Sequence, residues 1–169
     1  MAAANCEGQV AVVDDGVEVK QSAFGLGLFS TRTFQRLDLI TEYAGPLITS
    51  TEAKQCRERG DGSDSHFRGL SGMHTVIAGL RRPVAGLGGA SFANHRDGGS
   101  EWNADFRFVP VVREPLLSRC YQRRGRHDLG RIFLRARRVI PAGEEICAHY
   151  GCGYWALRLE AKVITPLLH

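Results

Sequence analysis

A tyrosine near the end of the chain and an Asn-His pair upstream of it are the residues best suited to chemistry. The segment Gly143-Glu144-Glu145-Ile146-Cys147-Ala148-His149-Tyr150-Gly151 predicts a strand that ends at Tyr150. A phenol donates and accepts hydrogen bonds, but its ordinary pKa near ~10 makes it a weak base at neutral pH. We therefore do not expect Tyr150 to act as a strong base. Gly25 and Gly27 lack side chains and would let a ligand approach the backbone closely.

Short strands must position these residues. Val and other β-branched residues flank Asp14-Asp15-Gly16, which predicts an opening hairpin with strands at 9–13 and 17–20. Apolar alternation or clustering predicts five more strands, at 26–30, 39–43, 74–78, 105–112 and 131–136. The predicted class is mostly β with short helices.

Two helical segments are expected. Thr49 with Glu52 three residues later forms a capping box for a short helix that ends before Gly60. Trp155, Leu159 and Val163 recur at four-residue spacing and predict a C-terminal helical segment at about 153–165. Residues 51–89 are rich in Gly and Ser around a single predicted strand, and we interpret them as a variable insert.

The bulk properties predict one domain over residues 1–169. Hydrophobic residues make up 43% of the 169 and charged residues 24%, which is ordinary for a globular protein. The net charge of +4 weakly favours an anionic neighbourhood. No signal peptide or membrane span is expected, so the chain is predicted not to be secreted or membrane-bound.

The five scattered cysteines contain no C-x-x-C pair, so neither a disulfide framework nor a zinc module is indicated. Cys147, His149 and Cys152 follow one another along a strand and turn, a spacing that rarely gives tetrahedral ligands, and a fourth ligand is not evident. No metal is expected.

Four sequence blocks occur in a telling order. They are Gly25-Leu26-Gly27-Leu28-Phe29, Tyr43-Ala44-Gly45-Pro46-Leu47-Ile48, Ser91-Phe92-Ala93-Asn94-His95, and Glu144 through Gly151. The first block lacks the third glycine of a dinucleotide-binding fingerprint, and taken alone Gly25-Leu26-Gly27 predicts a glycine turn between strands. The series resembles the motifs of SET-domain protein-lysine methyltransferases, and the tail is most like the small stand-alone SET proteins of viruses and protists.

The resemblance implies a SET fold of small twisted sheets, in which the Asn94 and Tyr150 segments cross in a pseudoknot-like arrangement. It also implies S-adenosyl-L-methionine as cofactor and a lysine amine as methyl acceptor. By resemblance, Tyr150 is the catalytic residue. The cofactor would contact Gly25, Leu26, Gly27, Asn94, His95, Tyr150 and Trp155.

The acceptor lysine would enter a channel lined by Tyr43, Phe106 and Tyr154. An apolar, aromatic channel penalises the charged ammonium and so favours the reactive neutral amine. Tyr43 and Phe106 each have an alternative interpretation as a plain core residue of a strand. Ala148 stands where many relatives carry the aromatic that limits methyl number, so the degree of methylation does not follow from the sequence.

The expected substrate is a histone tail or another lysine-bearing protein, and the expected location is the nucleus, with the cytoplasm as the other possibility. A basic loop with Arg119, Arg123, Arg124, Arg126 and His127 suggests contact with nucleosomal DNA, although a solvated loop is the plainer interpretation. Small viral relatives form homodimers. The alternative function is a catalytically silent SET module that binds a lysine-bearing peptide or chromatin, suggested by Ala148 and by the loop after His95, which lacks the family's proline.

Overall fold

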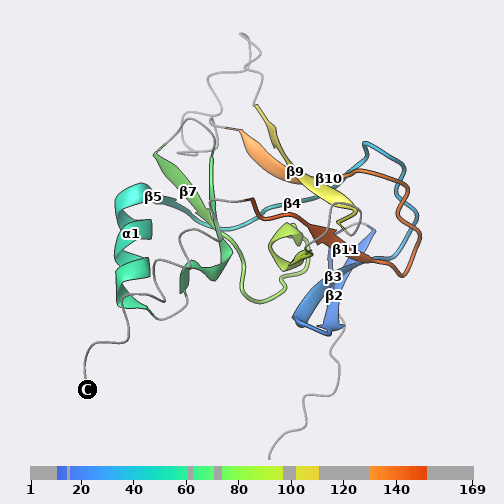
Figure 1. Cartoon of the computed structure of the whole chain (residues 1–169), viewed down its shortest axis with the longest axis horizontal. Coiled ribbons are helices and arrows are strands. Elements are labelled where there is room, and N and C mark those ends of the chain that lie inside the picture. The colour runs from blue at the N-terminus through green and yellow to red at the C-terminus, as the bar shows by residue number, and fades with distance from the viewer. Residues whose placement is uncertain are drawn as a thin grey trace, which may run out of the picture.

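Two β-sheets and one α-helix make up the described part of the chain (Figure 1). The computed structural model describes residues 11–14, 16–60, 63–70, 74–96, 102–110 and 130–151. The larger sheet contains β1 (Ala11–Asp14), β2 (Val17–Ser22), β3 (Gly25–Ser30), β4 (Leu39–Glu42), β8 (Asn94–His95), β9 (Ala104–Val109), β10 (Arg131–Ala136) and β11 (Glu145–Ala148). The smaller contains β5 (Leu47–Thr49), β6 (Phe67–Gly69) and β7 (Thr75–Ala78). The expected mostly-β class is confirmed.

The opening hairpin forms where the Asp-Gly signal predicts it. Gly16 has φ +82°, a conformation that glycine adopts without strain, and β1 and β2 pair antiparallel on either side of it. Val17 and Val19 of β2 and Leu28 of β3 are fully buried, because alternate residues of a strand face the same side. These side chains belong to a hydrophobic core cluster that also includes Ile77 of the smaller sheet.

β11 lies at the centre of the larger sheet (Figure 1). It pairs antiparallel with β3 and parallel with β8 and β9, with Cys147 opposite Asn94 and Ala148 opposite His95. The Asn94 and Tyr150 segments therefore lie side by side, as the resemblance implies, although His95 and Tyr150 are 55 residues apart in the sequence.

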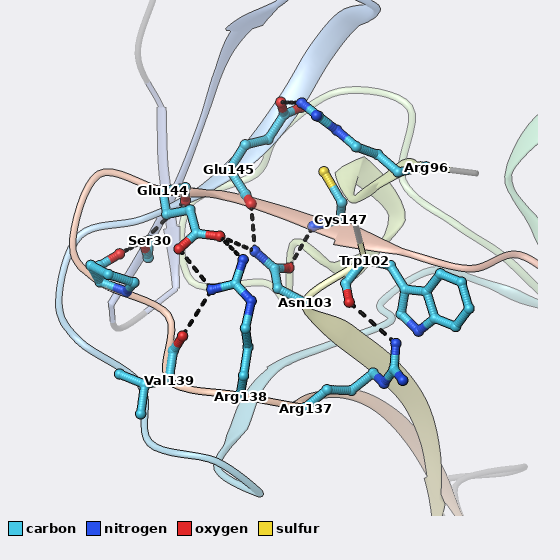
Figure 2. A network of polar contacts seen from close by, with 11 residues as sticks. Ser30, Arg96, Trp102, Asn103, Arg137, Arg138, Val139, Glu144, Glu145 and Cys147 are labelled. Carbon is cyan, nitrogen blue, oxygen red and sulfur yellow. Dashed lines mark hydrogen bonds and ion pairs between the residues drawn. The ribbon is translucent and has the colours of Figure 1, made fainter. Parts of the chain in front are cut away.

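A buried asparagine fastens β11 in place. Asn103 is 1% exposed, and its side-chain amide forms hydrogen bonds with Glu144, Glu145 and Cys147 at the start of β11 (Figure 2). The Nδ2 group donates to the Glu145 carbonyl and to Glu144 Oε1, both at 2.8 Å, and Oδ1 accepts from the Cys147 N–H at 2.8 Å. Arg138 and Asn103 lower the pKa of Glu144, so this carboxylate stays charged.

The helix α1 (Ser50–Arg59) begins and ends as predicted. Thr49 caps the Glu52 N–H, the Glu52 carboxylate returns to the Thr49 N–H, and Gly60 closes the helix with φ +64°. In Figure 1, α1 lies beside β5 and β7, which it also contacts.

Several sequence-based boundaries are wrong. The predicted insert at 51–89 contains a second strand, β6, which forms because it pairs with β7 and builds the smaller sheet. It also contains a short helical turn at Ser63–His66, and another follows it at Ala90–Phe92. Gly25 and Gly27 lie within β3. β11 ends at Ala148, since the Tyr150 N–H donates to a side chain, His95 Nδ1.

Some predicted features lie outside the described residues. They are the C-terminal helical segment at 153–165 with Tyr154 and Trp155, and the basic loop with Arg119, Arg123, Arg124, Arg126 and His127. Within the described ranges, no helix is long and apolar enough to cross a membrane.

Replacement of Asn103 tests how β11 is held. Asn103→Ala leaves the buried Cys147 N–H and the Glu145 carbonyl without their partner, and we expect it to lower the free energy of unfolding by about 3 kcal/mol. The measurement is urea denaturation followed by circular dichroism. Asn94→Ala is the control, with an expected loss of about 1 kcal/mol or less, because Ser22 and Arg96 still bond the carboxylate that Asn94 contacts. Equal losses in the two variants would contradict this role.

Candidate active site

The first part of the candidate site is the Asn94 cluster, which we define as Ser22, Gly27, Asn94 and Glu145. Glu145 Oε1 accepts from Ser22 Oγ at 2.7 Å and from Asn94 Nδ2 at 2.8 Å. Arg96 Nη2 donates to the other carboxylate oxygen at 3.3 Å. Because Nδ2 faces a carboxylate and the Leu26 carbonyl, Asn94 Oδ1 remains as the acceptor for a ligand.

Gly27 makes room for this cluster. A Cβ placed on Gly27 would lie 2.7 Å from Glu145 Oε1 and 3.1 Å from Asn94 Nδ2. At Gly25, by contrast, a Cβ would meet nothing within 4 Å. The two glycines thus have different roles: Gly27 admits the side chains of the cluster, and Gly25, with φ +99°, leaves open space at the start of β3.

Tyr150 lies just beyond β11 and is held at two points. Its hydroxyl donates to the Ala93 carbonyl at 2.8 Å, and its backbone N–H donates to His95 Nδ1 at 3.2 Å. His95 Nδ1 is therefore an acceptor, which leaves its proton on Nε2. The resemblance implies that His95 contacts the cofactor. The structure adds a role for the His95 ring, which accepts from the Tyr150 N–H and packs against the Tyr150 ring with 5.1 Å between centroids.

A chain of rings continues from this histidine. His95 lies 5.1 Å from His149, and His149 lies 5.0 Å from Trp102, measured between ring centroids. The Arg137 guanidinium covers the Trp102 ring at 4.4 Å. These contacts pack the end of β11 against the start of β9 and so support Tyr150 indirectly.

The second part of the site is the Tyr43 cluster, which we define as Tyr43, Arg68, Phe106 and Tyr150. Tyr43 and Phe106 meet edge to face with centroids 5.8 Å apart. Tyr43 is 6% exposed, and its hydroxyl donates to the His66 carbonyl at 2.7 Å. The Arg68 guanidinium lies on the Phe106 ring at 3.4 Å from its centroid. Desolvation by burial lowers the pKa of Arg68 to about 10, and the phenols of Tyr43 and Tyr150 oppose this shift.

Another glycine makes room for Tyr43. A Cβ on Gly79 would lie 2.8 Å from the Tyr43 ring and 2.9 Å from the His66 carbonyl. Gly79 thus permits the close packing that orients Tyr43 toward Phe106.

The structure brings together most of the predicted site residues. Tyr150 contacts His95, the residue after Asn94 on β8, and is also a member of the Tyr43 cluster. Tyr154 and Trp155 lie outside the described residues. Sequence reasoning missed Ser22, Arg68 and the supporting residues Asn103 and Trp102; none of them has a distinctive local pattern, and their roles follow from pairings between distant strands.

The comparisons with known proteins agree with this geometry. The SET domain family model matches residues 25–151, about three quarters of the chain. No curated protein sequence matches. The chain therefore belongs to the SET-domain family, whose members are generally protein-lysine methyltransferases.

The polar groups of the Asn94 cluster fit the amino-acid end of S-adenosyl-L-methionine. Asn94 Oδ1 can accept from an α-ammonium group, and the space beside Gly25 leaves the β3 backbone open to a ligand. Metal binding has no comparable support: among residues the structure describes, no group of three or more His, Cys, Asp or Glu side chains could hold a metal ion.

Cysteine reactivity tests the packing beneath the Asn94 cluster. Cys147 is 2% exposed, and burial raises the pKa of its thiol. Cys56 on α1 is half-buried and accepts a hydrogen bond from Arg59 at 2.8 Å. Because only the thiolate is alkylated, we expect iodoacetamide at pH 8 to modify Cys56 at least ~10-fold faster than Cys147, measured by peptide mass spectrometry. Equal rates would show that β11 is not packed as described.

Proposed function

We propose that the chain is an S-adenosyl-L-methionine-dependent protein-lysine N-methyltransferase. The observation that carries the proposal is the position of Tyr150, which contacts His95 of the β8 segment and belongs to the aromatic Tyr43 cluster. A residue so placed stands between a site for the cofactor and a site for the acceptor. In-line methyl transfer requires such an arrangement, because donor and acceptor approach from opposite sides.

When bound, the cofactor supplies an activated methyl group on a sulfonium. The residues of the chain bind the cofactor, orient the acceptor amine and exclude water from the site. Asn94 binds the amino-acid end, and the rings of Tyr43 and Phe106 surround an alkylamine and disfavour its charged form by desolvation. The Tyr150 hydroxyl, fixed by the Ala93 carbonyl, is positioned to orient the amine through its oxygen lone pairs.

The finer assignments belong to the same proposal. The substrate is a histone tail, the location is the nucleus, and the chain is of the small stand-alone type found in viruses and protists. The basic loop contacts nucleosomal DNA, and the chain forms a homodimer. The net charge of +4 supports an anionic neighbourhood such as chromatin.

Label transfer tests the proposal. The purified chain is incubated with S-adenosylmethionine that carries a radioactive methyl group and with core histones, nucleosomes or a lysine-free protein. We expect label on histones and none on the lysine-free control. Cofactor binding without label on any substrate would favour the alternative, a silent module that binds lysine-bearing peptides.

Two substitutions separate catalysis from cofactor binding. Tyr150→Phe removes one hydroxyl, and we expect turnover to fall at least ~100-fold while the Kd of the cofactor stays within about 2-fold. Asn94→Ala removes the ligand acceptor, and we expect the Kd to rise about 10-fold or more. Single-turnover label transfer and titration calorimetry measure the two effects. Unchanged turnover in Tyr150→Phe would remove Tyr150 from catalysis.

A further inference from the structure

A cationic side chain already occupies part of the Tyr43 cluster. Arg68 lies on β6 of the smaller sheet, and its guanidinium carbon is 3.4 Å from the centroid of the Phe106 ring on β9 of the larger sheet. This is the closest of the cation–ring contacts in the described residues, the others spanning 4.3–5.0 Å. A ring face that holds one cation at this distance has no room for a second.

The charge of Arg68 has little compensation nearby. Desolvation lowers its pKa to about 10, and the phenols of Tyr43 and Tyr150 oppose that shift. Among the residues that the structure describes, the carboxylates adjacent to this region pair with other cations, Glu42 with Arg131 and Asp105 with Arg135. Three histidines also lie close to these tyrosines: His95 on β8 and His149 lie beside Tyr150, and the His66 carbonyl accepts from the Tyr43 hydroxyl. Arg68 therefore adds a fixed positive charge to an otherwise aromatic site.

We propose that Arg68 is a specificity-determining residue of the acceptor site, which limits the site to neutral, unmethylated lysine and so to a single methyl transfer. The proposal rests on the function proposed above and names the form of lysine that the site accepts. Arg68 acts in two ways. It covers the face of Phe106, and its charge disfavours any cation bound near Tyr43 and Tyr150.

The chemistry explains why one transfer is favoured over three. In each transfer the amine lone pair forms a C–N bond, the C–S bond breaks, and its electron pair stays on sulfur as a thioether. The product is a methylammonium, which must lose a proton to solvent before it can react again. The Arg68 guanidinium lowers the pKa of a nearby lysine amine, so the unmethylated amine is neutral more often. The same charge repels the methylated ammonium groups, which are bulkier, and trimethyllysine stays charged at every pH.

Arg68 would take the place of the aromatic residue that limits methyl number in many relatives and that β11 lacks. Ala148 is small and fully buried, so it offers no bulk to limit methyl number. Arg68, on β6 of the smaller sheet, would supply both bulk and charge in the Tyr43 cluster.

Side-chain analogues of lysine test the proposal without requiring turnover. Butylamine and butyltrimethylammonium are titrated into the chain saturated with S-adenosylhomocysteine, and binding is followed through aromatic NMR signals. We expect Arg68→Met to bind butyltrimethylammonium at least ~10-fold more tightly than the unsubstituted chain. Arg68→Lys, which keeps the charge, should stay close to the unsubstituted chain. Arg107→Met, on the exposed side of β9, is the matched control and should change nothing.

With an active preparation, the products and the pH dependence give a second test. The unsubstituted chain should yield monomethyllysine only, and Arg68→Met should accumulate di- and trimethyllysine in mass spectra. The apparent pKa of the acceptor amine in the kcat/KM profile should rise by about one unit in Arg68→Met, because a neighbouring positive charge is removed.

The outcomes separate this proposal from the proposed function. Equal binding of butyltrimethylammonium by Arg68→Met and the unsubstituted chain would overturn the role of Arg68 even if label transfer succeeds. A gain for both analogues alike would also overturn it, since Arg68 would then be a simple plug that excludes every amine. Failure of label transfer together with the selective gain for butyltrimethylammonium would overturn only the methyltransferase, and the selectivity of Arg68 would stand.

Discussion

The amide of Asn103 is the contact on which the rest of the structure depends. It satisfies the Glu145 carbonyl and the N–H of the buried Cys147 at once. This fixes β11 between β3 on one side and β8 and β9 on the other. The strand then carries Tyr150 to His95, so one buried side chain sets the relation between the Asn94 cluster and the Tyr43 cluster.

Two adjacent carboxylates, Glu144 and Glu145, have different roles at the start of β11. Glu144 directly precedes β11 and Glu145 begins it, and the two side chains point away from each other (Figure 2). Glu144 is bonded by Asn103 and Arg138 and serves the fold. Glu145 orients Asn94 and Ser22 and serves the site. A shift of register by one residue would exchange these roles and lose both.

The sequence predicts the local parts of this arrangement well. The hairpin at Gly16 and the capping box of Thr49 and Glu52 depend only on neighbours along the chain, and both are confirmed. The family resemblance carried by the four blocks implies that the Asn94 and Tyr150 segments meet, and the structure shows them side by side. What the sequence does not show depends on distant partners: the three-residue strand β6 carries no periodicity, and it forms because β7 pairs with it. Arg68 likewise lies in an ordinary stretch, and only the packing of two sheets brings it to Phe106.

Binding of the cofactor product is the most direct test of the central claim, which is that β3 and the Asn94 cluster form a site for S-adenosyl-L-methionine. The measurement is calorimetric titration of S-adenosylhomocysteine into the unsubstituted chain, Gly27→Ala and Gly69→Ala. A Cβ on Gly27 would press on Glu145 and Asn94, whereas one on Gly69 meets nothing within 4 Å. We expect one-to-one binding by the unsubstituted chain and by Gly69→Ala, and a loss of at least ~10-fold in Gly27→Ala. No binding by the folded chain, or equal binding by all three, would contradict the account.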